Sequence, residues 1–171
     1  MVEQDDSFAF GQEGLQGLFT PLDEFFMREA IKQAKKAAEE DEVPVGAVIA
    51  LENKMIARAY NQVETLKDPT AHAEMIAITQ ATNFLGQKWL HQCHIYVTIE
   101  PCSMCAGALV LSRIKRIYYG AADPKTGACG SVVDLAHHPQ FNHRMEVYSG
   151  LLKEACTEMI SDFFRNKRLQ P

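Results

Sequence analysis

Apolar side chains at helical spacing mark the first predicted element. They recur every three or four positions, with charged residues between them, at Leu22, Phe26, Ala30, Ala34 and Ala37. This period places the apolar side chains on one face of a helix. Thr20 can cap the helix, and Pro21 suits the first helical position. The pattern therefore predicts a helix from Pro21 to about Glu40.

Short apolar runs predict the strands. Residues 43–51 and 55–60 flank a polar turn at 52–54, which indicates a hairpin whose second strand ends at Asn61. Further strands are predicted at 94–100, 113–121 and 145–150, and further helices at about 71–81, 101–111 and 151–168. Alternating strands and helices are typical of an α/β domain. We expect a three-layer α/β/α fold around a central mixed, five-stranded sheet.

Length and composition add domain limits to this picture. A chain of 171 residues with 47% apolar side chains can bury one core, which favours a single domain over residues 20–171. Residues 1–19 carry glycines without a regular period, and we expect a loosely ordered tail. No apolar run reaches 18 residues, and the acidic N-terminus does not resemble a signal peptide. We therefore expect a cytoplasmic protein without a membrane partner.

The net charge of -5 argues against a nucleic-acid binder until its distribution is considered. Residues 1–42 carry 11 acidic and 4 basic side chains, whereas residues 43–171 carry 11 acidic and 13 basic side chains. The acidity is thus concentrated in the tail and the first predicted helix. This distribution permits RNA binding without requiring it.

The motif PTAHAEM sets His72 and Glu74 two residues apart where a loop becomes a helix. In the middle of a helix, side chains at this spacing point about 200° apart and could not serve one site. In the first turn, with Thr70 as the cap, both side chains can approach a common point. The pair therefore needs partners from elsewhere in the chain.

Two cysteines in the motif EPCSMC can supply those partners. Cys102 and Cys105 lie three residues apart at the start of a predicted helix, so their sulfurs share one face. The helix dipole stabilises thiolates there, and thiolates are the species that bind metal. Together with the His72 imidazole they make a three-ligand set for Zn2+, and three protein ligands plus water are typical of a catalytic site.

Glu74 is then the candidate acid or base. Zinc polarises a bound water near neutral pH, and a carboxylate beside it can accept a proton without ligating the metal. Two alternatives stay open. One is a structural zinc site completed by Cys93, His94 or Cys129, and the other is a capped helix with a core histidine beside an unrelated thiol pair.

Together these motifs resemble the nucleobase deaminase signature, H-x-E followed by P-C-x-x-C. The resemblance extends over about residues 20–168 to bacterial tRNA-specific adenosine deaminases of the TadA type. It is carried by the segments VPVGAV, YNQVETLKDPTAHAEM, VTIEPCSMCAGAL, DPKTGACGSVVDLAHHPQFNHRMEV and SDFFRNKR. It implies a cytidine deaminase-like fold, a homodimer, and one Zn2+ per chain held by His72, Cys102 and Cys105. The implied reaction converts the wobble adenosine of a tRNA-Arg anticodon to inosine, by attack of zinc-bound hydroxide on C6 with Glu74 as proton shuttle.

The same resemblance implies which residues hold the anticodon stem-loop: Asn61, Ala73, Asp123, Lys125, Asn142, Phe164 and Arg165. Asn61 would hold the flipped base, although it could be a turn residue. Loop 123–131 would flank the pocket, although its glycines could be turn formers. In the last helix, one phenylalanine would face the core while Phe164 stacks on a base and basic residues meet phosphates. The alternative there is a solvated helix end.

Other residues and functions complete the set of expectations. His91, Cys93 and His94 could suggest a second metal site, but we expect core and surface placement instead. Cys129 and Cys156 are expected to be small buried apolar residues. A small-substrate deaminase acting on guanine, cytosine or cytidine would use the same zinc chemistry. A catalytically silent zinc scaffold or RNA-binding module is a further alternative, which would have no need for Glu74.

Overall fold

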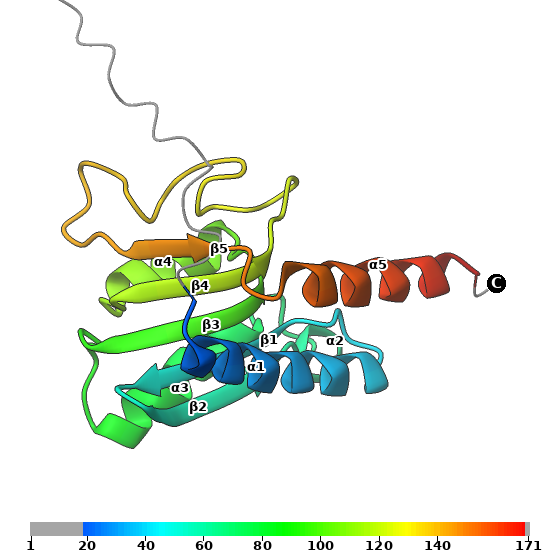
Figure 1. Cartoon of the computed structure of the whole chain (residues 1–171), viewed down its shortest axis with the longest axis horizontal. Helices are drawn as coiled ribbons and strands as arrows, with labels where there is room; N and C mark the ends of the chain where they lie inside the picture. Colours follow the sequence, from blue (N-terminus) through cyan, green and yellow to red (C-terminus); the bar gives the residue numbers. More distant parts are fainter. Residues whose placement is uncertain (1–18, 170–171) are drawn as a thin grey trace, which may run out of the picture.

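The structure, a computed structural model, describes residues 19–169 and contains one mixed sheet flanked by helices (Figure 1). The strands are β1 (Gly46–Leu51), β2 (Lys54–Tyr60), β3 (Cys93–Ile99), β4 (Arg116–Ala121) and β5 (Glu146–Ser149). They lie in the order β2-β1-β3-β4-β5. Strand β1 pairs antiparallel with β2 and β3, whereas β3, β4 and β5 run parallel. The predicted mixed, five-stranded sheet is confirmed.

Helices cover both faces of this sheet. They are α1 (Pro21–Glu39), α2 (Val63–Leu66), α3 (Ala73–Leu85), α4 (Ser103–Leu111) and α5 (Lys153–Leu169). Helices α1 and α5 lie on the face turned toward the viewer in Figure 1, and α3 and α4 lie behind the sheet. The predicted three-layer α/β/α arrangement is therefore confirmed.

Each face of the sheet has its own apolar core, because side chains alternate along a strand. In β1, Ala47 and Ile49 pack with the core under α3 and α4, whereas Val48 and Ala50 pack with the core under α1. Gly46 allows α1 to approach β1 closely, since a Cβ there would lie 2.0 Å from the Ala30 carbonyl oxygen. The sheet is thus held rigidly between two helical layers.

The start of α1 follows its predicted signals. The Asp23 backbone N–H donates to the Thr20 hydroxyl oxygen at 3.2 Å, and the Thr20 backbone N–H donates to the Asp23 carboxylate at 2.8 Å. This reciprocal pair is a capping box, with Pro21 at the first helical position. The predicted cap at Thr20 is therefore confirmed.

The two helices near the candidate site begin two residues later than predicted. Helix α3 starts at Ala73 because His72, and not Thr70, is its N-cap residue. The Thr70 backbone N–H instead donates to the Asp68 carboxylate at 2.8 Å. Helix α4 starts at Ser103 because Cys102 is its N-cap residue. The predicted starts at residues 71 and 101 are therefore wrong, although both motifs do lie at helix N-termini.

Other boundaries also differ from the prediction. Helix α3 continues past residue 81 to Leu85 and ends at Gly86, which has a left-handed φ of 64°. Strand β4 starts at Arg116 rather than residue 113, since Arg113 has a left-handed φ of 57°. Helix α2 was not predicted, because its four residues show no apolar period.

The predicted N-terminal tail lies outside the described residues, apart from Phe19. The Phe19 ring packs on Tyr118, with the two ring centroids 6.4 Å apart. Over residues 19–169, no helix has both the length and the apolar character needed to cross a membrane.

Candidate active site

Two helix N-termini carry the predicted metal ligands. His72 and Cys102 are the N-cap residues of α3 and α4, and neither side chain makes a capping hydrogen bond. Their backbone carbonyls nevertheless accept the first bonds of each helix, from Ile76 and Ala106. Both side chains therefore stay available for another partner.

Three donor atoms converge between these helix ends. The His72 Nδ1 lies 3.7 Å from the Cys102 Sγ and 3.5 Å from the Cys105 Sγ. All three atoms lie within 4.8 Å of one another, in the one group of this kind that residues 19–169 contain. Cys93, His94 and Cys129 do not join it. The donor set is therefore two sulfurs and one imidazole, which suits zinc and is one ligand short of a closed structural site.

Of these three donors, Cys102 is held in its deprotonated, metal-binding form. Hydrogen bonds from Cys105 and then from His72 lower the pKa of Cys102 to about 4. The hydrogen bond with the Cys102 sulfur, together with burial, raises the pKa of Cys105. The hydrogen bond with Cys102 also raises the pKa of His72. At neutral pH Cys102 is thus a thiolate, the form in which cysteine binds metal.

Glu74 lies beside this group in the first turn of α3. Its side chain is 3% exposed, and burial raises its pKa to about 7. Within the described chain, its Oε2 is the buried side-chain oxygen or nitrogen atom that lacks a hydrogen-bond partner. Leaving such an atom unpaired typically costs about 1–3 kcal/mol. The unpaired Glu74 oxygen therefore indicates that a ligand binds here. A water molecule on a metal ion at the neighbouring donor group would be such a ligand.

Asn61 is buried rather than exposed at a turn, with 6% of its surface accessible. Its Nδ2 donates to the Glu42 carboxylate at 3.2 Å. The next residue, Gln62, donates through its N–H to the Ala71 carbonyl at 3.0 Å, which brings the end of β2 beside His72. Ala73 is the first residue of α3, so its N–H has no acceptor within the helix. Asn61 and Ala73 therefore flank the donor group.

Loop 123–131 lies against the start of α4. The Ala128 N–H donates to the Pro101 carbonyl at 2.8 Å, and Cys102 and Gly127 form an isolated antiparallel bridge. Lys125 is exposed on this loop. The Asp123 carboxylate accepts a hydrogen bond from the Lys125 N–H at 2.9 Å, so this carboxylate stabilises the turn in which it lies.

The Glu100 side chain anchors loop 123–131 through hydrogen bonds. Its buried carboxylate accepts from the N–H groups of Asp123, Cys129 and Ser131, each at 3.0 Å, and from the Ser131 hydroxyl. A Cβ at Gly127 would lie 2.4 Å from the Glu100 Oε2. Gly127 is therefore required by close packing on a carboxylate, and it is more than a turn former.

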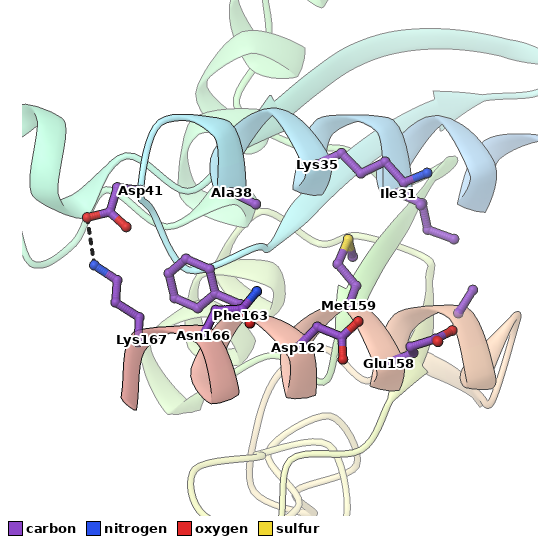
Figure 2. Close-up of a pocket in the computed structure, with 11 residues that line it drawn as sticks. Ile31, Lys35, Ala38, Asp41, Glu158, Met159, Asp162, Phe163, Asn166 and Lys167 are labelled. Atoms are coloured by element: carbon purple, nitrogen blue, oxygen red, sulfur yellow. Dashed lines mark hydrogen bonds and ion pairs between the residues drawn. The ribbon is translucent and has the colours of Figure 1, made fainter. Parts of the chain in front are cut away.

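The two phenylalanines of α5 differ in exposure and share only part of their surroundings, since Phe163 lines two hollows and Phe164 lines one of them. Phe163 is half-buried and lines a groove of about 550 Å³ between α1 and α5, together with Ile31 and Met159 (Figure 2). Phe164 is 43% exposed and lines a second hollow of about 600 Å³, which Glu64 and Thr65 border. Neither hollow includes the donor residues at the helix N-termini.

Two basic residues of α5 have acidic neighbours. Arg165 pairs with Asp162 on the same helix, and Lys167 Nζ lies 2.6 Å from the Asp41 carboxylate, as the dashed line in Figure 2 marks. Asn142 is exposed on the long loop that joins β4 to β5. The structure therefore leaves Phe164 and Asn142 accessible, and partly engages Arg165.

Two buried carboxylates at the site, Glu42 and Glu100, are absent from the sequence predictions. The available signal was an acidic residue beside an apolar strand, in EVPVGAV and VTIEPC. A charged group at such a position is buried only when it is paired.

The predicted burial of Cys129 and Cys156 is confirmed, and His91 is exposed while Cys93 is buried.

Comparisons with known proteins agree with this site. The family model of MafB19-like deaminases matches residues 23–168. The tRNA-specific adenosine deaminase of Bacillus subtilis (strain 168) is 51% identical over 146 residues, which cover 85% of this chain and 91% of that protein. The corresponding enzyme of Aquifex aeolicus (strain VF5) is 48% identical over 145 residues, covering 85% of this chain and 95% of that protein.

Two solved structures share this fold. A structure described in a study of A-to-I editing by tRNA:A34 deaminases is 47% identical, with a TM-score of 0.77, and covers 79% of this chain and 98% of that chain. A guanine deaminase from Nitrosomonas europaea has a TM-score of 0.68 at 22% identity and covers 88% of this chain and 93% of that chain, which shows the shared fold alone. With its deaminase fold, its His-Cys-Cys group and these close relatives, the chain belongs to the tRNA-specific adenosine deaminase family.

Proposed function

We propose that the protein hydrolyses the wobble adenosine of a tRNA anticodon to inosine, with release of ammonia. The observation that carries this proposal is the unpaired Glu74 carboxylate oxygen beside three converging metal ligands. The tRNA substrate is supported by the 51% identity to a tRNA-specific adenosine deaminase. The particular tRNA species, tRNA-Arg, stays a prediction.

His72, Cys102 and Cys105 would hold a zinc ion. When bound, zinc supplies a polarised water that is readily deprotonated near neutral pH. Two thiolates and a neutral imidazole cancel most of the charge of the dication. A base is therefore needed more strongly here than at a site with three histidines.

Glu74 would act as that base and then as an acid. With a pKa of about 7, it can be ionised or protonated at neutral pH. It takes a proton from the attacking water as the C6–O bond forms and delivers it to the ring nitrogen N1, and it then takes the proton of the new C6 hydroxyl and delivers it to the departing amino group. The C6–N bond then breaks, and inosine and ammonia leave.

Asn61 and Ala73 would hold the base against Glu74. The amide of Asn61 can hydrogen bond to the base edge, and the free N–H of Ala73 is a donor at the helix N-terminus. Asp123, Lys125, Asn142, Phe164 and Arg165 would contact the splayed anticodon loop, by stacking or by phosphate contacts. These assignments stay predictions, as do the homodimer and the cytoplasmic location.

A substrate panel tests the proposal. Zinc-loaded protein is incubated separately with an anticodon stem-loop carrying adenosine at the wobble position, with free adenosine, with guanine and with cytosine. We expect inosine in the stem-loop at a kcat/KM far above that for any free base or nucleoside. Faster turnover of guanine or cytosine would establish the small-substrate alternative, and no turnover at all would support the silent scaffold.

A further inference from the structure

Glu42 follows the end of α1 and is completely buried, although it is a carboxylate. It accepts three hydrogen bonds: from the Thr65 N–H at 2.6 Å, from the Glu64 N–H at 3.1 Å and from the Asn61 Nδ2 at 3.2 Å. A buried charge is tolerated only when it is paired or hydrogen bonded in this way. Glu42 therefore joins three separate segments, the end of α1, the end of β2 and helix α2.

The hydrogen bonds keep Glu42 ionised. Burial opposes ionisation, but the bonds from the Thr65 and Glu64 backbone hold the pKa of Glu42 below its ordinary value. An ionised carboxylate accepts hydrogen bonds and cannot donate them. Its position beside Asn61 therefore admits only one orientation of the Asn61 amide.

That orientation matters because an asparagine amide has two states related by a half-turn, which exchange its oxygen and nitrogen. With Nδ2 directed to Glu42, the Oδ1 and the second Nδ2 hydrogen take defined directions. The Asn61 backbone is held as well, since its N–H donates to the Val45 carbonyl at 3.0 Å. A base that meets Asn61 thus finds one fixed pattern of donor and acceptor.

Glu42 also holds the backbone of helix α2 through the N–H groups of Glu64 and Thr65. Glu64 and Thr65, whose N–H groups it binds, line the hollow of about 600 Å³ that Phe164 also lines. One carboxylate consequently sets both the orientation of Asn61 and the position of α2.

We propose that Glu42 is a positioning residue for deamination, which acts by orienting the Asn61 amide toward the substrate base. This inference rests on the proposed function and on the role of Asn61 in base binding. A purely structural role, in which Glu42 only anchors α2, predicts a loss of stability with effects on activity that are independent of Asn61.

A double-mutant cycle separates these roles. Glu42→Gln keeps the size of the side chain but can present an NH2 group to Asn61, so two donors face each other. We expect kcat/KM on the anticodon stem-loop to fall about 10-fold to 100-fold in Glu42→Gln and by a similar factor in Asn61→Ala. The double variant should be no slower than Asn61→Ala, because the amide that Glu42 orients is already gone. Zinc content should stay at the wild-type value in all three proteins.

Glu39→Gln is the matched control, because it removes the same charge from an exposed position on the last turn of α1. We expect its kcat/KM to equal that of the wild-type protein. Glu42→Asp is the second variant in case Glu42→Gln melts below the assay temperature, since it keeps the charge and withdraws the carboxylate by one methylene. It should lower kcat/KM in the wild-type background and leave the Asn61→Ala background unchanged.

Three outcomes are distinguishable. Full coupling between positions 42 and 61 supports the inference. Independent, multiplying losses, or an unchanged kcat/KM in both Glu42 variants, would overturn it while leaving the proposed function intact. A wild-type protein that does not deaminate the stem-loop would instead remove the proposed function itself.

Discussion

In the proposed site, metal binding and proton transfer are carried out by different residues. Glu74 is not among the converging donors, which are His72, Cys102 and Cys105. Glu74→Gln should therefore retain about one zinc per chain while kcat on the stem-loop falls about 10²-fold to 10⁴-fold, the range typical of general acid-base groups. Elemental analysis and single-turnover assays measure the two quantities. Loss of zinc from Glu74→Gln would show that the carboxylate is a ligand.

The cysteines differ in pKa because their surroundings differ. Hydrogen bonds from Cys105 and His72 lower the pKa of Cys102 to about 4, whereas burial raises the pKa of Cys93 to about 11 and that of Cys156 to about 12. A thiol with a lowered pKa stays ionised until the pH falls to that value, so Cys102 is a thiolate throughout pH 5–8. In metal-free protein, iodoacetamide should modify Cys102 first, at a rate nearly constant over this range.

Peptide mapping by mass spectrometry identifies the modified cysteine. Zinc-loaded protein is the control, since a metal-bound thiolate is protected and modification should slow. A rate at Cys102 that rises about tenfold with each pH unit would show an ordinary thiol there.

At the scale of elements, the site depends on where α3 and α4 begin. Their N-cap residues, His72 and Cys102, make no side-chain capping bonds of their own. Each helix therefore presents a ligand together with the positive end of its dipole, which favours thiolate and carboxylate. Loop 123–131 is the third part of the site, and the Glu100 carboxylate holds it beside Cys102.

Helix α5 is the element expected to hold RNA phosphates. Arg165 and Arg168 are exposed, and the only ion pair between them and the described acids joins Arg165 to Asp162. The double variant Arg165→Ala/Arg168→Ala should flatten the log-log salt dependence of stem-loop binding, by up to about 0.7 for each lost phosphate contact. Fluorescence anisotropy over a series of KCl concentrations measures the slope.

Two comparisons make this prediction specific to α5. Arg28→Ala/Lys32→Ala removes two exposed bases from the middle of α1, each with an acidic neighbour, and should leave the slope unchanged. Lys167→Ala breaks the contact with Asp41 that ties α5 to the end of α1, so it should lower stability more than it changes the slope. An identical slope in the Arg165 and Arg168 double variant would place the phosphate contacts elsewhere, for instance in loop 123–131.

At the scale of the whole molecule, metal binding links segments that are far apart in sequence. Zinc binds the native arrangement of His72, Cys102 and Cys105, so it should stabilise the fold by about 4 kcal/mol at a thousandfold excess over its Kd. For a chain of this size, each kcal/mol corresponds to roughly 2–4 °C in Tm. Removing zinc with a chelator should therefore lower Tm by roughly 8–16 °C, as measured by calorimetry.

Cys102→Ala provides the control for metal removal. It lacks a ligand, so its Tm should be low and the same with or without chelator. An equal chelator-induced drop in this variant would show that the chelator acts somewhere other than at the three-ligand group.

The sequence by itself determined the features that depend on neighbouring residues. The capping box at Thr20, the hairpin of β1 and β2, and the placement of both motifs at helix starts follow from local preferences that act over a few residues. The grouping of His72, Cys102 and Cys105 was also predictable, because zinc chemistry restricts which side chains can share a site, and the resemblance carried over these residues and Glu74 by position.

Only the tertiary structure decided the contacts between distant segments. Glu42 meets Asn61 and Thr65 across 19 and 23 residues, Glu100 meets Ser131 across 31, and Lys167 meets Asp41 across 126. Helix α2 belongs to the same class, because its start is held by the Glu42 carboxylate and not by its own sequence. Local sequence patterns do not predict these pairings. The partners of a buried charge come from distant segments, which are brought together only by the order of the strands and the packing of the helices.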